Sequence, residues 1–313
     1  MVLHEDAQRL LDMIAASGRP PLIELSVADA RKVFSAGRAV TQPEPPEVAE
    51  MRDLAAPGPL GDISLRLYRG IGTAAGTALP TLVFYHGGGW VIGDLDSHDQ
   101  VCRQIANEAG CCVVAVDYRM GPEHKFPAAV NDAAAATRWI IEQGAALGVD
   151  AGHIAVGGDS AGGNLAAVMA IMARDGYLPK IHFQMLIYPA TDMAMQTQSV
   201  ARVQAGVPLT ASTMRWFLGH YLGKPADVHD WRASPARVVD LSGVAPAFVL
   251  TCSHDPLNDE GREYAERLER EGVATTYVHM ADQMHGFLTS GRIVRASGVA
   301  ISMAVACMRS AWT

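Results

Sequence analysis

The sequence predicts an α/β protein in which a mostly parallel central sheet is flanked by helices and carries a helical cap. Two observations lead to this prediction. From residue 62 onward, short apolar segments of strand type alternate with helical segments. Residues 193–223 interrupt this alternation with a purely helical pattern, and residues 1–45 are mainly helical as well. We therefore expect a core domain of residues 46–192 and 224–313, with 1–45 and 193–223 forming the cap.

Strand-type segments are recognised by their short length and their apolar character. The first alternates apolar and polar residues, as a half-exposed strand does, and the others have the pattern of buried strands. They cover residues 62–69, 80–86, 112–119, 153–160, 182–189, 246–255 and 275–280.

Helical spacing of apolar residues predicts helices at the N-terminus, between the strands and at the end of the chain. They cover about 5–16, 27–36, 97–110, 126–144, 160–176, 259–272 and 291–310. Ser26 is expected to cap the second helix, and Ser97 with Gln100 to form a capping box for the third. The prolines of residues 41–50 predict an extended linker, because each disfavours helix at the preceding residue.

The composition is that of a globular protein with an acidic surface. Of the 313 residues, 49% are hydrophobic and 19% charged, and the formal net charge is −8. This charge argues against a nucleic acid or an anionic membrane as partner. We expect no signal peptide, because no basic region precedes an apolar stretch at the N-terminus, and no membrane span, because no apolar run is long enough. An odd number of cysteines without zinc-type spacing predicts a cytoplasmic location. The five cysteines lack zinc-type spacing and are expected to be reduced core residues.

A run of three glycines, Gly87 to Gly89, follows the apolar segment that ends at His86. Glycine beside a strand loses packing and costs backbone entropy, so the run needs a physical reason. One reason is a set of backbone N–H groups that receive a developing oxyanion, because a Cβ there would obstruct the approaching oxygen. A tight turn is the alternative for an isolated run. A phosphate loop is disfavoured, since Gly223-Lys224 lacks the Walker spacing.

A second motif, GDSAG at residues 158–162, fits the pattern G-x-S-x-G. It lies between an apolar strand segment and an alanine-rich helical segment. This is the context of a nucleophile elbow, a sharp turn that holds a serine in a strained backbone conformation. We therefore predict Ser160 as a nucleophile rather than part of a plain glycine-rich turn. The N–H groups of Gly88, Gly89 and Ala161 would then be the oxyanion donors.

A serine nucleophile needs a histidine base and an acid that orients it, here in the order acid, histidine along the chain. His285 lies in a loop just beyond a strand, and Asp255 ends another strand at the edge where sheet-based sites gather. We predict a triad of Ser160, Asp255 and His285, with Asp192 as the reserve acid. The other downstream histidines are assigned to strands, to the insertion or to the surface: His182, His220, His229, His254 and His279.

Together these motifs resemble those of the bacterial hormone-sensitive-lipase-like esterases of the GDSAGG type. The matching segments are HGGGW (86–90), GDLDSHD (93–99), DYR-x-GPEHKFPAA (117–129), GDSAGGN (158–164), YP (188–189), DPL (255–257) and HGF (285–287). They occur in the order typical of that family. The chain departs from the family pattern at Met120-Gly121, at Asn258 and at His254.

The resemblance implies an α/β-hydrolase fold whose cap is built from the N-terminus and from an insertion after the sixth core strand. It also implies the same triad and the same oxyanion donors. The expected activity is hydrolysis of short- to medium-chain acyl esters, a small-molecule substrate, without metal or cofactor. A homodimer formed through an edge strand is expected by analogy.

Other residues near the motifs are expected either to line the substrate pocket or to support the structure. Five aromatic residues are candidates for the acyl or alcohol pocket, with cap or core packing as the alternative: Trp90, Tyr188, Trp216, Phe217 and Phe287. His86 is expected to hydrogen-bond the backbone and hold the glycine loop. Asp117, Tyr118, Arg119 and Glu123 are expected to form one polar cluster beneath the site.

Two rival functions are weighed against this hypothesis. A binding protein of the same fold would have lost a member of the triad, whereas serine, acid and histidine are all present here. An amidase, deacetylase or acyltransferase would use the same groups, and its leaving-group preference would depend on the shape of the pocket. The sequence leaves this second alternative open.

Overall fold

The computed structural model describes residues 2–313 and is centred on an eight-stranded sheet in the order β1-β2-β4-β3-β5-β6-β7-β8. Strand β2 pairs in antiparallel fashion with both β1 and β4, and every other pair of neighbouring strands is parallel. This confirms the predicted mostly parallel sheet. The strands are β1 (Glu50–Gly58), β2 (Gly61–Arg69), β3 (Leu79–Tyr85), β4 (Cys112–Asp117), β5 (Val149–Asp159), β6 (Phe183–Ile187), β7 (Ala247–His254) and β8 (Thr275–Met284).

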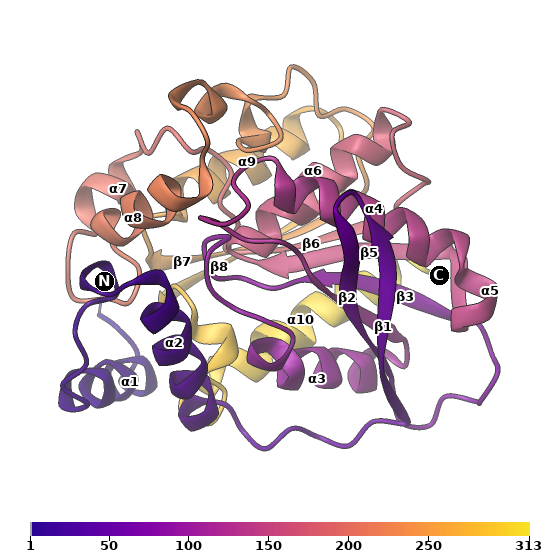
Figure 1. Cartoon of the computed structure of the whole chain (residues 1–313), viewed down its shortest axis with the longest axis horizontal. Coiled ribbons are helices and arrows are strands. Elements are labelled where there is room, and N and C mark those ends of the chain that lie inside the picture. The colour runs from indigo at the N-terminus through magenta and orange to yellow at the C-terminus, as the bar shows by residue number, and fades with distance from the viewer. Residues whose placement is uncertain (1) are drawn as a thin grey trace.

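Helices cover both faces of the sheet (Figure 1). One face carries α3 (Asp99–Ala109) and α10 (Ala296–Ser310), which pack against each other. The opposite face carries α4 (Ala128–Glu142), α6 (Ala161–Arg174) and α9 (Asn258–Arg270), with the short α5 (Gly144–Leu147) next to β5. The sheet is thus the middle layer of three, as the alternation of strands and helices predicted.

The side chains of β3 show why its sequence is almost entirely apolar. Val83 and Tyr85 belong to the core cluster on the α4–α6 side, whereas Leu82 and Phe84 belong to the cluster on the α3–α10 side. Successive residues of a strand point to opposite faces, so a strand covered on both faces needs apolar residues at every position. Pairing of β3 with β4 and β5 then places the segment after Tyr85 beside the end of β5.

The remaining helices gather at the end of the sheet to which the strands β3, β5 and β6 point (Figure 1). They are α1 (Glu5–Ala16), α2 (Val27–Thr41), α7 (Gln198–Arg202) and α8 (Ala211–Tyr221). Within residues 193–223 the structure contains helices and loops and no strand, in agreement with the helical pattern of that segment. The N-terminal segment and the 193–223 segment contact each other, because η1 (Leu22–Glu24) packs against α8.

Strand β1 was missed by the sequence analysis. Its sequence mixes charged residues with small ones, contains Pro57 and has only one buried residue, so it lacks the pattern of a strand. The strand exists because its backbone pairs with β2 from Glu50↔Arg69 to Gly58↔Gly61. Its register therefore depends on a partner segment rather than on its own periodicity.

The two predicted helix caps have different outcomes. Ser26 caps α2 as predicted, because its Oγ accepts a hydrogen bond from the N–H of Asp29. The prediction of a capping box between Ser97 and Gln100 was wrong. Helix α3 begins at Asp99, Ser97 Oγ accepts from the N–H of Asp94, and the Gln100 amide donates to Gln104. A turn upstream of the helix competes for the serine hydroxyl.

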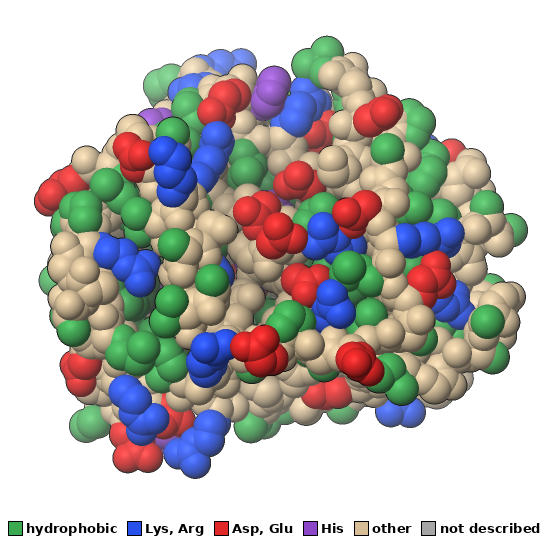
Figure 2. All heavy atoms as spheres, turned by 60° about the horizontal axis from the view of Figure 1, so that its bottom comes forward, with side chains coloured by type: hydrophobic (Ala, Val, Ile, Leu, Met, Phe, Trp, Pro, Cys, Tyr) green, Lys and Arg blue, Asp and Glu red, His purple; other side chains and the backbone are tan. Residues whose placement is uncertain are grey.

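No helix within residues 2–313 is long and apolar enough to cross a membrane. On the face drawn in Figure 2, side chains of Lys and Arg are interspersed with those of Asp and Glu. This mixture agrees with the modest net charge of −8.

Gly70, just after β2, offers a test of how tightly α3 packs on the sheet. A Cβ at this position would overlap the backbone carbonyl oxygen of Ala106 in α3. We expect Gly70→Ala to lower the free energy of unfolding by about 1–3 kcal/mol, because backbone has to move to relieve the overlap. The matched control is Gly219→Ala in α8, where a Cβ meets open space. Replacing this helical glycine should stabilise by up to ~1 kcal/mol. Urea denaturation measures the stability of both variants. Equal stabilities of Gly70→Ala and wild type would contradict the packing of α3.

Candidate active site

Ser160 lies at the turn between β5 and α6 with φ 56° and ψ −116°. This conformation is unfavourable for a residue with a side chain and confirms the predicted strain. The turn needs glycine on both sides. A Cβ on Gly158 or on Gly162 would overlap the carbonyl oxygen of Tyr85, the last residue of β3. The serine is therefore held at the carboxyl end of the central strand β5 by backbone packing.

The structure brings the predicted serine, histidine and acid into one hydrogen-bonded line. His285 Nε2 lies 2.9 Å from Ser160 Oγ, and His285 Nδ1 lies 2.7 Å from Asp255 Oδ2. Asp255 is fully buried, and its other oxygen accepts a hydrogen bond from the N–H of Leu257 at 2.8 Å. This fixes the carboxylate, which in turn orients the imidazole toward the serine.

The glycine loop after β3 adopts backbone conformations that favour glycine, with φ 123° at Gly88 and 60° at Gly89. A Cβ on Gly88 would overlap the carbonyl oxygen of Ile92, and one on Gly89 would overlap the ring of Phe217. Close protein neighbours thus explain these glycines, in addition to the approach of a substrate oxygen that the sequence analysis considered. Within residues 2–313, the N–H groups of Gly88 and Gly89 have no protein acceptor.

His86 supports the glycine loop, as predicted. Its Nδ1 lies 2.8 Å from the carbonyl oxygen of Gly87, and its ring stacks on Tyr118 with centroids 4.4 Å apart. Burial, together with the proximity of His98, lowers the pKa of His86 to about 4. The imidazole is therefore neutral at pH 7 and serves as a structural group.

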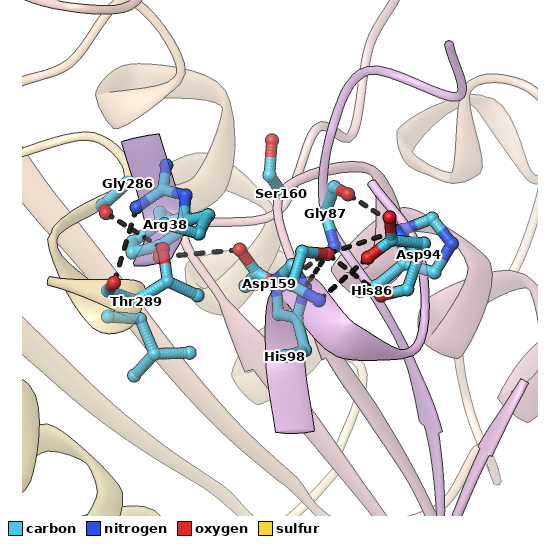
Figure 3. Close-up of polar contacts among 12 residues, drawn as sticks. Arg38, His86, Gly87, Asp94, His98, Asp159, Ser160, Gly286 and Thr289 are labelled. Carbon is cyan, nitrogen blue, oxygen red and sulfur yellow. Dashed lines mark hydrogen bonds and ion pairs between the residues drawn. The ribbon is translucent and has the colours of Figure 1, made fainter. Parts of the chain in front are cut away.

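Asp159 connects the elbow to the glycine loop (Figure 3). Its Oδ1 accepts a hydrogen bond from the N–H of Gly87 at 2.9 Å and lies 2.9 Å from His98 Nε2. Its Oδ2 accepts a longer hydrogen bond from the hydroxyl of Tyr188 at 3.4 Å. Burial favours the neutral acid, but the interactions with His98 prevail and hold the pKa of Asp159 below its usual value. No local pattern in the sequence indicates this role, although Asp159 is part of the elbow motif.

The polar cluster predicted beneath the site does not form as one unit. Tyr118 donates a hydrogen bond to the carbonyl oxygen of His86, whereas Arg119 pairs with Asp132. Glu123 pairs with Arg31 of α2 at 2.7 Å and so contacts the N-terminal helices. Asp117 lies near His86, and burial with the charges of Asp94 and Asp96 raises its pKa to about 6. These side chains point in different directions because they occupy a strand end and a turn.

The alternative acid and two of the alternative bases have other partners. Asp192 pairs with Arg237 at 2.9 Å instead of a histidine. His279 contacts Thr251 and Ser253 on β7, and His182 contacts the backbone of Ile154. Within residues 2–313, no cluster of His, Cys, Asp and Glu is arranged to hold a metal ion.

Glu260 has a role that its sequence position did not reveal. It lies in the first turn of α9, where an acidic residue favours the helix dipole, as expected. It is also buried, and its Oε1 accepts hydrogen bonds from the N–H groups of Thr191 and Asp192. Burial raises the pKa of Glu260 well above its usual value. The side chain ties α9 to the loop after β6, a contact that no local pattern indicates.

A cavity of about 680 Å³ opens above Ser160 and His285. Its walls come from α1, α2, α8 and the glycine loop, and they are mostly apolar. Of the five predicted pocket aromatics, Trp90 and Phe217 line it. Tyr188, Trp216 and Phe287 are not among its lining residues. Tyr188 is buried against His285 and Phe287, with ring centroids 4.5 and 5.8 Å away.

The comparison with protein families identifies the fold. Residues 82–289 match the model of a family described as alpha/beta hydrolase fold. The chain belongs to the α/β-hydrolase family. The matched range contains the glycine loop, the elbow, Asp255 and His285. The resemblance predicted from the motifs is thereby confirmed at the level of an α/β-hydrolase esterase family.

Curated relatives and a solved structure agree with this assignment. The chain is 41% identical over 283 residues to the carboxylic ester hydrolase LipN of Mycobacterium tuberculosis, covering 87% of this chain and 74% of the relative. It is 37% identical to the ethyl acetate hydrolase of Pseudomonas putida over 99% of both chains. An α/β hydrolase enzyme from the metagenome of Lake Arreo superposes with a TM-score of 0.95 at 43% identity, over 99% of this chain and 98% of that one. The prediction of a hydrolytic enzyme of the esterase class is confirmed.

The buried carboxylate of Asp159 makes a pH-dependent contribution that can be measured. Because its native pKa is depressed, that contribution is present above the unfolded pKa of about 4 and is lost as the pH falls through the native value. We expect Asp159→Asn to be about 1–3 kcal/mol less stable than wild type at pH 7, and the difference to shrink toward pH 3. Urea denaturation at both pH values checks this. Asp53→Asn, which removes a mostly exposed partner of Arg66, is the control and should change stability little. A deficit of Asp159→Asn that is equal at both pH values would contradict the assignment.

Proposed function

We propose that this protein is a serine carboxylesterase that hydrolyses short- to medium-chain acyl esters through an acyl-enzyme. The observation that carries the proposal is the line from Asp255 through His285 to Ser160, with heavy-atom distances of 2.7 and 2.9 Å. Both distances are within the range for proton transfer and orientation. The nucleophile, its base and the orienting acid all come from the carboxyl ends of sheet strands.

In the first step, Ser160 Oγ attacks the ester carbonyl while its proton moves to His285 Nε2. Asp255 accepts the hydrogen bond from Nδ1–H, which keeps the imidazole in the tautomer whose Nε2 is free to take that proton. The imidazolium then donates the proton to the leaving alkoxide. The alcohol departs, and the acyl group stays on Ser160.

The tetrahedral intermediate carries a negative oxygen that needs N–H donors. We propose the backbone N–H groups of Gly88, Gly89 and Ala161 for this purpose. Two facts support them: those of Gly88 and Gly89 have no acceptor within residues 2–313, and Ala161 is the first residue of α6, whose N–H lacks an intrahelical partner. Donors held rigidly in a partly buried site need little reorganisation when the charge develops.

In the second step, water attacks the acyl-enzyme. His285 takes a proton from the water and returns one to Ser160 Oγ, so the acid leaves and the serine is restored. The apolar cavity walls, which include Trp90 and Phe217, would hold the acyl or alcohol group. The name of the Pseudomonas putida relative, ethyl acetate hydrolase, supports a small ester as substrate.

We further propose that residues 1–45 and 193–223 act together as a cap over the core of 46–192 and 224–313. The cavity supports this division, because it lies between Ser160 and lining residues of both segments. A cytoplasmic location and a homodimer remain predictions from the sequence.

Ser160→Ala tests the nucleophile. We expect hydrolysis of p-nitrophenyl butanoate to fall by roughly 10⁵-fold or more, because the covalent path is lost. The melting temperature should stay close to that of wild type, since alanine removes only the hydroxyl. Labelling of wild type with a fluorophosphonate, followed by peptide mapping, should modify Ser160 alone. Unchanged turnover of the variant, or a label on another residue, would reject the site.

Substrate preference is tested with a series of p-nitrophenyl esters and matched anilides. We expect kcat/KM to peak between acetate and octanoate and to be about tenfold lower for hexadecanoate, because a longer chain extends past the apolar walls and buries no further surface. The anilides should be hydrolysed more slowly than the esters. A higher kcat/KM for an anilide would favour an amidase instead.

A further inference from the structure

Arg38 places a positive charge in the wall of an otherwise mostly apolar cavity. It lies on α2 and lines the same cavity as Ser160 and His285. Figure 3 shows its side chain beside Gly286 and Thr289. A Cβ built on Gly286, the neighbour of His285, would lie 4.0 Å from Arg38 Nη2. The guanidinium is thus one residue away from the proposed catalytic base.

Only part of the guanidinium is used by the protein. Nη1 lies 3.3 Å from the carbonyl oxygen of Thr289 and 3.3 Å from Ser290 Oγ. Within residues 2–313, neither Nε nor Nη2 has an acceptor. A guanidinium has five N–H donors, and its Nε–Nη2 edge presents two parallel ones. That edge matches the two oxygens of a carboxylate, so the unused donors favour a bidentate partner.

No carboxylate in the described part of the chain neutralises Arg38 by direct contact. Asp159 is the carboxylate whose charge acts on Arg38, but its oxygens are already engaged by Gly87, His98 and Tyr188. Burial lowers the pKa of Arg38, while Tyr188 and Asp159 act in the opposite direction. The guanidinium is partly buried, so it has lost some of its hydration without gaining an ion-pair partner, and an anion in the cavity would compensate for this loss.

The side chain is held in place before any ligand binds. Its guanidinium lies 4.6 Å from the centre of the Phe34 ring, one helical turn earlier on α2. The two contacts to Thr289 and Ser290 hold it from the other side. A donor group that is already oriented loses little conformational freedom on binding, which increases affinity and selectivity.

We propose that Arg38 binds a carboxylate on the substrate, so that anionic esters form a substrate class of this enzyme. The class comprises half-esters of dicarboxylic acids and esters whose alcohol part carries a carboxylate. The inference rests on the proposed esterase function and adds a specificity-determining residue to it. The carboxylate would contact Arg38 while the ester carbonyl reaches Ser160.

The test compares each anionic ester with its neutral carboxamide analogue. The probes are monoethyl succinate, monoethyl glutarate, monoethyl adipate and 4-carboxyphenyl acetate, and the readout is the ratio of kcat/KM between the members of each pair. We expect Arg38→Met to lower this ratio at least about tenfold for one pair or more, because a charge-assisted hydrogen bond is lost. Arg38→Lys keeps the charge but loses the paired donors, so its ratio should be intermediate.

Lys32→Met is the matched control. Lys32 lies on the same helix, has an exposed side chain paired with Asp29 and does not line the cavity. The Lys32→Met substitution removes one positive charge, as Arg38→Met does. It should leave the kcat/KM ratio of every pair within about twofold of wild type, because exposed charges are screened by solvent and salt. A fall of less than tenfold for all pairs in Arg38→Met would overturn the proposal. Equal losses on both members of each pair would show that Arg38 only positions the loop of Thr289.

A second measurement needs no variant. Free glutarate should inhibit hydrolysis of p-nitrophenyl butanoate by the wild-type enzyme at lower concentration than glutaramide does. Equal inhibition by both compounds would count against the proposal. Failure of the proposed esterase function can be distinguished from failure of the Arg38 proposal, because the neutral esters would then not be hydrolysed. Neutral hydrolysis with unchanged ratios would overturn only the role of Arg38.

Discussion

The close approach of two backbones, at the turn after β5 and at the end of β3, is the constraint on which the site depends. Gly158 and Gly162 are needed because any Cβ there would overlap the carbonyl oxygen of Tyr85. This contact lets Ser160 occupy its strained conformation and places the glycine loop, which continues from β3, next to the serine. The proposed nucleophile and the proposed N–H donors thus share one rigid support, and rigid donors are what stabilise a charge that appears only during reaction.

A buried polar network reinforces this support. Asp159 binds the N–H of Gly87 and contacts His98, so a carboxylate next to the nucleophile also holds the glycine loop. Burying a charge costs several kcal/mol unless it is paired and hydrogen-bonded. Both oxygens of Asp159 have partners, and the network holds the elbow and the glycine loop in one geometry.

The helices outside the sheet layers determine what the site can receive. Residues of α1, α2 and α8 give the cavity a mostly apolar wall, which suits an acyl chain or an alcohol. Arg38 is one of the few charged residues in this wall, and it brings two unused donors next to the loop of His285. A mostly apolar wall with an oriented guanidinium combines non-directional affinity with a directional contact. In the proposed function, chemistry and selectivity are thus carried by different parts of the fold.

The sequence by itself determined the layered α/β architecture and the residues Ser160, Asp255 and His285, because strand periodicity, the elbow motif and chain order are all local signals. Only the tertiary structure decided the existence of β1, the buried contact of Glu260 with the loop after β6, and the separation of the expected polar cluster. It also decided the place of Arg38, whose partner Thr289 lies 251 residues away in sequence. These features depend on which distant segments meet, and side-chain partners and burial arise only when the layers pack together.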